Sequence, residues 1–249
     1  MNTGKDYFSG VAGSYAEYRP RYPAALVDLL ADLAPGRETA WDAGCGSGQL
    51  SVALAERFAR VIATDASEPQ LAQATAHPRV EYRRASAEAS GIPSATVDLA
   101  TAAQAVHWFD RPVYYQEVRR VCRPGALIAL VTYNLFRITP ELDRIIDHFY
   151  WQTIWQYWPP ERRLVEAGYR TLDFPFAELS APPLEIQAEW TLPHVLGFVS
   201  TWSALRGLER DRGGRVVEEF ARELSGAWGP AETRRQVRWE LAVRLGRVP

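Results

Sequence analysis

The sequence has 249 residues, of which 47% are hydrophobic, and a formal net charge of −2 at pH 7. A chain of this length and apolar content can bury a full core, so we expect a single α/β domain over residues 1–249. The mild charge excludes the broad basic surface of a nucleic-acid binder, because acidic residues interrupt the arginine clusters at 206–215 and 234–238.

Residue usage disfavours several other classes of site and location. The sequence contains no run of about 18 apolar residues that could span a membrane, and its first residues lack an apolar signal core. Lys5 is the only lysine, which excludes a G-K-[ST] phosphate loop and an internal Schiff-base lysine. The four histidines have no metal-ligand spacing, and Cys45 and Cys122 lie far apart, as is typical of a reducing compartment. We therefore expect a cytoplasmic protein with no metal and no nucleic-acid or membrane partner.

The first half of the chain alternates short apolar runs with helical patterns. Pro23 begins a helical pattern over 22–34, which has leucines on one face and ends at Pro35 and Gly36. Strand patterns follow at 39–43, 60–65, 80–84, 97–103 and 126–133, and helical patterns at 49–58, 68–76 and 112–121. Because strand, crossover and strand repeat in this order, the sequence predicts a doubly wound, mostly parallel sheet.

The last third of the chain has a different pattern. Apolar and polar residues alternate over 184–190 and 237–245, which predicts strands with one solvated face. Two helical patterns, at about 194–206 and 214–228, lie between them. We therefore expect an antiparallel pair of C-terminal strands, interrupted by a helical insertion, at the edge of the sheet.

The turn after the first predicted strand carries the most informative motif, Trp41-Asp42-Ala43-Gly44-Cys45-Gly46-Ser47-Gly48. A strand that turns sharply into a helix beneath a ligand needs glycine, because glycine accepts positive φ and lets the ligand approach the backbone. The unpaired N–H groups at the start of the helix would point at that ligand. The spacing is G-x-G-x-G, and Gln49 stands where the dinucleotide fingerprint G-x-G-x-x-G has its third glycine. An NAD-type Rossmann oxidoreductase is therefore the less favoured alternative.

An acidic residue, Asp65, ends the next strand, 17 residues past Gly48 (65 − 48). There its carboxylate can accept hydrogen bonds from both hydroxyls of a ribose. The Asp-x-Gly-x-Gly-x-Gly turn with this acid resembles motif I of the class I S-adenosylmethionine (SAM) dependent methyltransferases. The resemblance implies a Rossmann-like seven-stranded sheet, SAM as cofactor, S-adenosylhomocysteine as product, and cofactor contacts at Asp42, Gly44, Gly46, Asp65 and Ala66. A non-catalytic SAM-binding protein of the same fold is the alternative.

Segments after the next two strands extend the resemblance. Ser86 and Ala87 look like the family's contact to adenine, although the family often has aspartate where this chain has Ser86. Ala66 stands where a larger apolar residue commonly covers the adenine, which implies a looser cofactor edge. Gln104 follows the fourth strand at the carboxyl edge of the sheet, where open α/β sheets bind ligands, and we assign it to the cofactor site.

The N-terminal segment from Tyr7 to Pro23 is similar to the lid of methyltransferase type 11 proteins, especially the branch that resembles trans-aconitate methyltransferase. In that resemblance residues 1–23 form a lid, Arg19 pairs with the methionyl carboxylate of SAM, and Tyr15 closes over the sulfonium. Residues 134–230 then form an elaboration on the acceptor side. The alternative for the N-terminal segment is a proline-rich surface turn.

His107 and Trp108 follow the fourth strand, and we assign them to the methyl acceptor. His107 is the candidate catalytic residue, as a base or as a donor that orients the acceptor; a packed, hydrogen-bonded histidine is the alternative. Trp202 lies in an aromatic-rich segment that could wall an acceptor pocket or belong to the core. Arg137 and Arg206 could hold a carboxylate. The sequence thus predicts methyl transfer to a small-molecule acceptor, at a carboxylate or a hydroxyl, and leaves the oligomeric state open.

Overall fold

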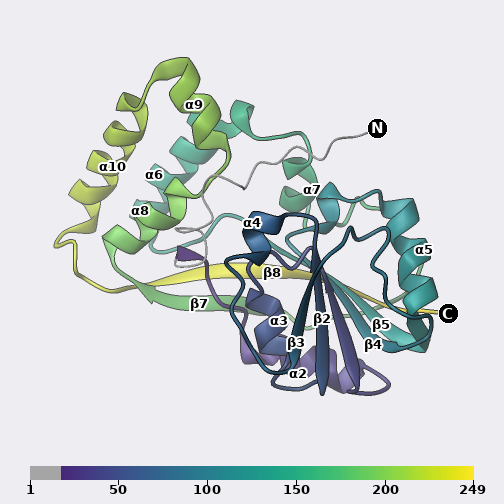
Figure 1. Cartoon of the computed structure of the whole chain (residues 1–249). Coiled ribbons are helices and arrows are strands. Elements are labelled where there is room, and N and C mark those ends of the chain that lie inside the picture. Colours follow the sequence, from purple (N-terminus) through teal and green to yellow (C-terminus); the bar gives the residue numbers. More distant parts are fainter. Residues whose placement is uncertain (1–17) are drawn as a thin grey trace.

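The computed structural model describes residues 18–249, which form a curved sheet flanked by helices (Figure 1). Within these residues the sheet has eight strands in the order β3-β2-β1-β4-β5-β8-β6, and β7 pairs with β8 beside this path. The expected class, a doubly wound and mostly parallel sheet with an antiparallel C-terminal pair, is confirmed. The number of strands is eight rather than seven because the short strand β6 (Ala177–Leu179) pairs with the end of β8 (Arg235–Arg247).

The parallel strands determine where a ligand can bind. They are β1 (Thr39–Ala43), β2 (Arg60–Asp65), β3 (Val80–Arg84), β4 (Val97–Ala103) and β5 (Cys122–Tyr133). The chain places β2 and β3 on one side of β1 and then returns to place β4 on the other side. The strand order therefore reverses between β1 and β4, and open α/β sheets bind ligands outside the carboxyl ends of the strands at such a point.

Side chains of the sheet alternate between two buried clusters, one on each face. Val61 belongs to the first cluster together with residues of α2 (Ala24–Leu33) and α3 (Gln49–Leu54). Its neighbour Ile62 belongs to the second, together with residues of α5 (Arg111–Val121). Because successive strand residues point to opposite faces, the continuous apolar runs of the sequence cover both faces with helices.

Two helices are shorter than their sequence patterns predict. α3 ends at Leu54, and α4 spans only Glu68–Leu71. The corresponding helical patterns in the sequence extend to residues 58 and 76. Beyond α4, the Thr75 N–H donates to the Ser47 carbonyl at 3.2 Å, and the Tyr82 hydroxyl donates to the Thr75 carbonyl at 2.8 Å. These bonds hold the segment against the glycine turn and β3, so it does not continue as a helix.

Residues 134–230 supply β6, β7 (Leu184–Trp190) and a helical elaboration, which gathers at one end of the sheet (Figure 1). Its helices are α6 (Pro140–Asp147), a π-helical turn (His148–Ile154), a 3-10 turn (Trp155–Tyr157), α7 (Arg162–Glu166), α8 (Leu192–Ser200), α9 (Ala204–Arg212) and α10 (Arg215–Trp228). The expected helix over 194–206 is divided into α8 and α9. It breaks at residues 201–203, where the Thr201 hydroxyl donates to the Phe198 carbonyl and Trp202 is buried.

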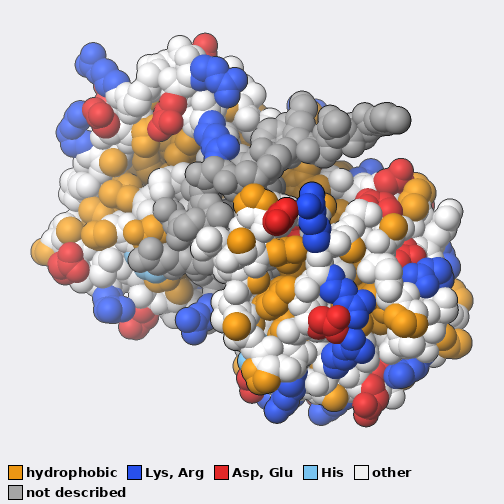
Figure 2. Space-filling view, viewed as in Figure 1, with side chains coloured by type: hydrophobic (Ala, Val, Ile, Leu, Met, Phe, Trp, Pro, Cys, Tyr) orange, Lys and Arg blue, Asp and Glu red, His pale blue; other side chains and the backbone are white. Residues whose placement is uncertain are grey.

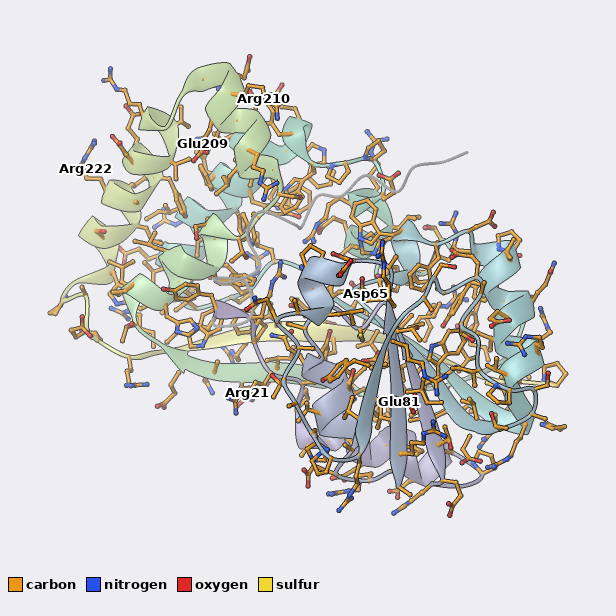
Figure 3. All side chains as sticks on the ribbon, viewed as in Figure 1. Arg21, Asp65, Glu81, Glu209, Arg210 and Arg222 are labelled. Atoms are coloured by element: carbon orange, nitrogen blue, oxygen red, sulfur yellow. The ribbon has the colours of Figure 1, made fainter. Side chains whose placement is uncertain are left out.

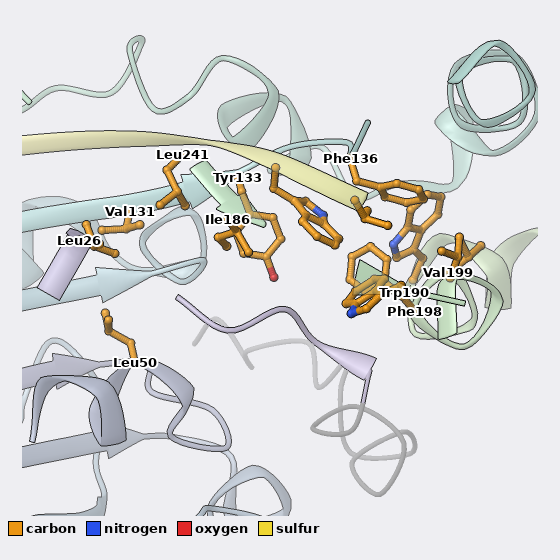
Figure 4. Close-up of a cluster of buried hydrophobic side chains, with 14 of the residues drawn as sticks. Leu26, Leu50, Val131, Tyr133, Phe136, Ile186, Trp190, Phe198, Val199 and Leu241 are labelled. Carbon is orange, nitrogen blue, oxygen red and sulfur yellow. The ribbon is translucent and has the colours of Figure 1, made fainter. Parts of the chain in front are cut away.

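The elaboration and the sheet share one hydrophobic core. The first cluster runs from Leu26 of α2 through Val131 of β5 to Trp190 and Phe198 at the base of the elaboration (Figure 4). Further out, the ring of Phe149 in the π-helical turn stacks on the ring of Phe220 in α10. The centroids of the two rings are 4.0 Å apart. Contiguous packing of this kind predicts that the two parts unfold together.

Phe220→Ala tests this shared core. Phe220 is 5% exposed, so its loss should lower the free energy of unfolding by about 3–4 kcal/mol through the cavity it leaves. Urea unfolding followed by tryptophan fluorescence and by circular dichroism should show one coincident transition. Glu219→Ala, at an exposed position of the same helix, is the control and should change stability by less than about 0.5 kcal/mol. Separate transitions for helices and sheet would contradict the shared core.

Candidate cofactor and acceptor site

The glycine turn lies at the carboxyl end of β1, and all three of its glycines have positive φ: 68° at Gly44, 55° at Gly46 and 82° at Gly48. A Cβ at Gly44 would lie 2.6 Å from the Ala105 side chain, and one at Gly48 would overlap the Tyr82 hydroxyl. A Cβ at Gly46 would have no described atom nearer than 3.7 Å. Two of the glycines are thus required for packing within the protein, and the third leaves the turn open to a ligand.

Asp65 ends β2 beside the glycine turn, near the centre of the view in Figure 3. One carboxylate oxygen accepts the Gly46 N–H and the other the Ser67 N–H, both at 2.8 Å. Burial raises the pKa of this carboxyl, and the two N–H donors oppose that rise. Each oxygen keeps a further lone pair, so the carboxylate can accept two more hydrogen bonds from a ligand.

Asp42 is completely buried and connects three elements. The Ser51 hydroxyl of α3 donates to one carboxylate oxygen at 2.6 Å, and the Thr101 hydroxyl of β4 donates to the other at 3.0 Å. Burial raises the pKa of Asp42 to about 6 in spite of these two donors. The structure therefore places Asp42 as a brace beneath the glycine turn rather than at its surface.

The residues expected at the adenine end lie on neighbouring strand ends. Asp65 and Arg84 are paired in register, so Ala66 and Ser86 follow adjacent strands. Ala66 and Ser86 are exposed, whereas Ala87 is buried. This placement leaves the two exposed positions accessible to a ligand that extends from Asp65 across the edge of the sheet.

A cavity opens next to the turn, outside the carboxyl ends of β4 and β5. Its lining includes Arg19, Gln104, His107, Trp108, Tyr133, Asn134, Trp158, Arg162, Phe198 and Trp202. Of the expected residues, Arg19, Gln104, His107, Trp108 and Trp202 are thus brought together, whereas Arg137 and Arg206 are exposed and do not line it. Tyr15 lies outside the described residues.

His107 lies on a 3-10 turn (Val106–Trp108) that begins three residues after the end of β4, and it is only 8% exposed. Its Nδ1 is 2.8 Å from the hydroxyl oxygen of Tyr169. Burial and the nearby cations Arg162 and Arg111 lower the pKa of His107 to about 3. The imidazole is therefore neutral at physiological pH and can act through one acceptor and one donor nitrogen.

Two guanidinium groups face the cavity, and its lining within the described residues contains no aspartate or glutamate. Arg19 lies 5.4 Å from the centre of the Phe198 ring, and Arg162 lies 4.8 Å from the centre of the Trp158 ring. Arg162 lines the cavity and uses its Nε for the Tyr150 hydroxyl at 2.8 Å and for Glu166 at 3.0 Å. Its terminal nitrogens donate no hydrogen bond to a described residue. The lining is therefore suited to a negatively charged ligand.

Sequence reasoning missed Asn134 and Arg162, whereas Trp158 belongs to an aromatic segment that it had considered for the acceptor pocket. Asn134 had a usable signal, because it follows β5 at the ligand-binding edge of the sheet. Its Nδ2 donates to the Glu166 carbonyl at 3.1 Å, while its Oδ1 is buried without a partner, as is Nε1 of Trp158. Within residues 18–249 the Asn134 oxygen is thus an unpaired acceptor and the Trp158 nitrogen an unpaired donor, and buried polar groups of this kind ordinarily have a partner.

Comparisons with known proteins show that this chain is similar to methyltransferases. The model of a methyltransferase domain family matches residues 41–130, from the glycine turn to β5. A Dictyostelium discoideum protein named as a methyltransferase is 33% identical over 90% of this chain and 86% of its own. A Mycolicibacterium smegmatis protein named as an S-adenosylmethionine-dependent methyltransferase is 30% identical over 59% of this chain and 57% of its own.

A solved structure is similar over almost the whole chain. It is that of a protein from Anaeromyxobacter dehalogenans described as a type II methyltransferase, which is 51% identical, with a TM-score of 0.88 over 92% of this chain and 98% of the other.

Among residues 18–249 no helix is long and apolar enough to cross a membrane, and no group of three or more His, Cys, Asp or Glu side chains could hold a metal ion.

Asp42→Asn tests the buried brace through the pH dependence of stability. Burial raises the pKa of Asp42 to about 6 in the folded protein, whereas an exposed aspartate of the unfolded chain has a pKa near 3.8. Between pH 3.8 and about 6 the folded state therefore binds more protons than the unfolded chain. As the pH rises through this range, Asp42 lowers the free energy of unfolding by about 3 kcal/mol in all. The free energy of unfolding in urea, measured from pH 4 to 7, should fall in the wild type. In the variant the part of that fall that comes from Asp42 should be absent. Parallel profiles would contradict the assignment.

Proposed function

Because the chain belongs to the class I SAM-dependent methyltransferases, we propose that it methylates a small organic anion bound in the cavity beside the glycine turn. The observation that carries the proposal is the lining of this cavity, which includes Arg19 and Arg162 and, among the described residues, no carboxylate. The resemblance of residues 7–23 to the trans-aconitate methyltransferase branch also favours an acidic acceptor.

The glycine turn and its neighbours fit SAM. Gly46 leaves the turn open, and Asp65 keeps lone pairs for two ribose hydroxyls. Ala66, Ser86 and Ala87 would border the adenine, while Arg19 would pair with the methionyl carboxylate. When bound, SAM supplies a methyl group already activated by the positive sulfur. The protein's own contribution is then mainly to hold the acceptor in line with that methyl group and to exclude water.

Arg162 is the cation that we assign to the acceptor. Its guanidinium is fixed over Trp158 and by Glu166, so a planar anion can form paired hydrogen bonds to its terminal nitrogens without reordering it. Trp202 and Phe198 supply flat apolar walls in the same cavity. The acceptor class that fits is a compact anion with an apolar or aromatic body.

We also propose that the chain acts as one methyltransferase domain, with 134–230 as its acceptor side and 1–23 as its lid. Support for the first part comes from the hydrophobic cluster that joins the sheet to the elaboration. Support for the second comes from residues 18–23, of which Arg19 lines the cavity.

On the face shown in Figure 2, basic and acidic side chains are interspersed, consistent with a small-molecule rather than a nucleic-acid partner.

Asp65→Ala tests the cofactor assignment. Loss of the charged hydrogen bonds to the ribose should weaken SAM and S-adenosylhomocysteine by about 1–3 kcal/mol in isothermal titration calorimetry. Glu81→Ala is a matched control, because Glu81 is an acid on the neighbouring strand β3, away from the carboxyl edge (Figure 3). The control should bind SAM like the wild type. Equal affinity in all three proteins would remove Asp65 from the cofactor site.

Arg162→Ala tests the acceptor. Carboxylates and phosphates are first screened as acceptors by the formation of S-adenosylhomocysteine. For an active anion, the variant should have a KM about 10–100-fold higher than the wild type, because a charged hydrogen bond to the acceptor is lost. Its affinity for SAM should be unchanged. Arg137→Ala is the control, since Arg137 pairs with Asp147 at 2.8 Å outside the cavity. An active acceptor that is neutral, with the same KM in both variants, would contradict the proposal.

A further inference from the structure

We infer that Gln70 belongs to the cofactor site and forms a hydrogen bond to a hydroxyl of the SAM ribose, beside Asp65. Gln70 is not among the residues that the motif assigns to the cofactor. The inference rests on the proposed function only in that Asp65 holds the ribose, and it is independent of the acceptor.

The residues around Gln70 could form a capping box at the start of α4, but the structure pairs them differently. Ser67 is the N-cap of α4, and Gln70 follows three positions later, where the glutamine of a capping box accepts the N–H of the N-cap residue. Here Asp65 accepts the Ser67 N–H instead, at 2.8 Å. The Ser67 hydroxyl forms no capping bond. The Gln70 amide is therefore not required by the helix.

This amide is buried, and one end of it is unpaired. Gln70 is 5% exposed, and its Oε1 is buried with no hydrogen bond to a described residue. Buried polar atoms ordinarily have a partner, because an unpaired one loses its bonds to water without replacement. A ligand that supplies a hydrogen bond to this amide would restore what burial removes.

The unpaired oxygen lies against the open part of the glycine turn. A Cβ built on Gly46 would lie 3.7 Å from the Gln70 Oε1, which is the nearest described atom to it. The N–H of the same glycine donates to Asp65 at 2.8 Å. The Gln70 amide and the Asp65 carboxylate therefore both lie close to Gly46, the residue that leaves the turn open to a ligand.

The segment that carries Gln70 is held at both ends. α4 begins three residues after the end of β2, and the Ser67 N–H ties its start to Asp65. After α4, the Thr75 N–H donates to the Ser47 carbonyl of the turn at 3.2 Å. A buried side chain on a segment fixed in this way can bind a ligand with little loss of conformational freedom.

A ribose hydroxyl fits this pair of side chains. The Asp65 carboxylate can only accept hydrogen bonds, whereas a hydroxyl can donate one and accept others. A hydroxyl can therefore donate to Oε1 of Gln70. A hydroxyl whose proton goes to Asp65 can instead accept from Nε2 of the same amide after a half-turn of that amide. Because SAM and S-adenosylhomocysteine carry the same ribose, the contact should stabilise both equally and leave kcat unchanged.

Gln70→Met tests the contact, since methionine is similar in length and has no strong hydrogen-bonding group. In isothermal titration calorimetry the variant should bind SAM and S-adenosylhomocysteine about 3–10-fold more weakly than the wild type, because one neutral hydrogen bond is lost. Gln73→Met, at an exposed glutamine just after α4, is the matched control and should bind both like the wild type. Wild-type affinity in Gln70→Met would overturn the inference.

Analogues of S-adenosylhomocysteine that lack the 2′- or the 3′-hydroxyl separate a direct contact from an effect on the fold. If Gln70 pairs with a ribose hydroxyl, the difference in affinity between Gln70→Met and the wild type should disappear for at least one of the two analogues. The same difference for S-adenosylhomocysteine and for both analogues would show that Gln70 acts through the fold, and would overturn the inference.

The melting temperature of the ligand-free protein gives a readout without cofactor. Because the Gln70 oxygen is unpaired there, an apolar replacement should leave the melting temperature unchanged or raise it. A lower melting temperature would contradict the inference. Weaker SAM binding in Asp65→Ala but not in Gln70→Met would contradict this inference alone, whereas unchanged binding in Asp65→Ala would contradict the proposed cofactor contact itself.

Discussion

The site depends on a buried carboxyl that joins three elements at the carboxyl edge of the sheet. Asp42 of β1 accepts from Ser51 of α3 and Thr101 of β4, so the end of β1 is fixed against both neighbours. Burial disfavours its ionised form, as its raised pKa shows, and the two hydroxyls only partly offset that penalty. The glycine turn starts directly above this brace. Its position also sets the distance between the turn and the residues that follow β4.

The cofactor site and the acceptor site that we propose lie on the two sides of that edge. On the side of β2 and β3, backbone geometry dominates: positive φ at three glycines and a carboxylate held by two N–H groups leave an open turn for the cofactor. On the side of β4 and β5, side chains dominate, and the helical elaboration supplies cations and aromatic walls through Arg162 and Trp202. Because the elaboration and the sheet share one core, the proposed acceptor side is built on a rigid base.

Local patterns in the sequence were sufficient for the sheet and the glycine turn, because strand period, glycine spacing and the place of Asp65 all lie within single short segments. The elaboration was predicted only in outline. Helix α6 has a helical period in Leu142, Ile145 and Ile146 that sequence reasoning passed over. The break at Trp202 follows from burial that no local pattern records. Arg137 and Arg206 were predicted to hold a carboxylate of the acceptor. Arg137 pairs with Asp147 outside the cavity, whereas Arg162, from another segment, lines it. Tyr169 reaches His107 across 62 positions of sequence, and its left-handed backbone has only the preceding Gly168 as a hint.

The account's central claim is that a methyl group passes from SAM to a small organic anion held at Arg162. The most direct measurement incubates the wild type and Arg162→Ala with methyl-labelled SAM and a metabolite extract, and identifies the compound that receives the label. The account predicts that this compound is an anion and that the variant labels it much less. Label on a neutral compound, to the same extent in both proteins, would contradict the account.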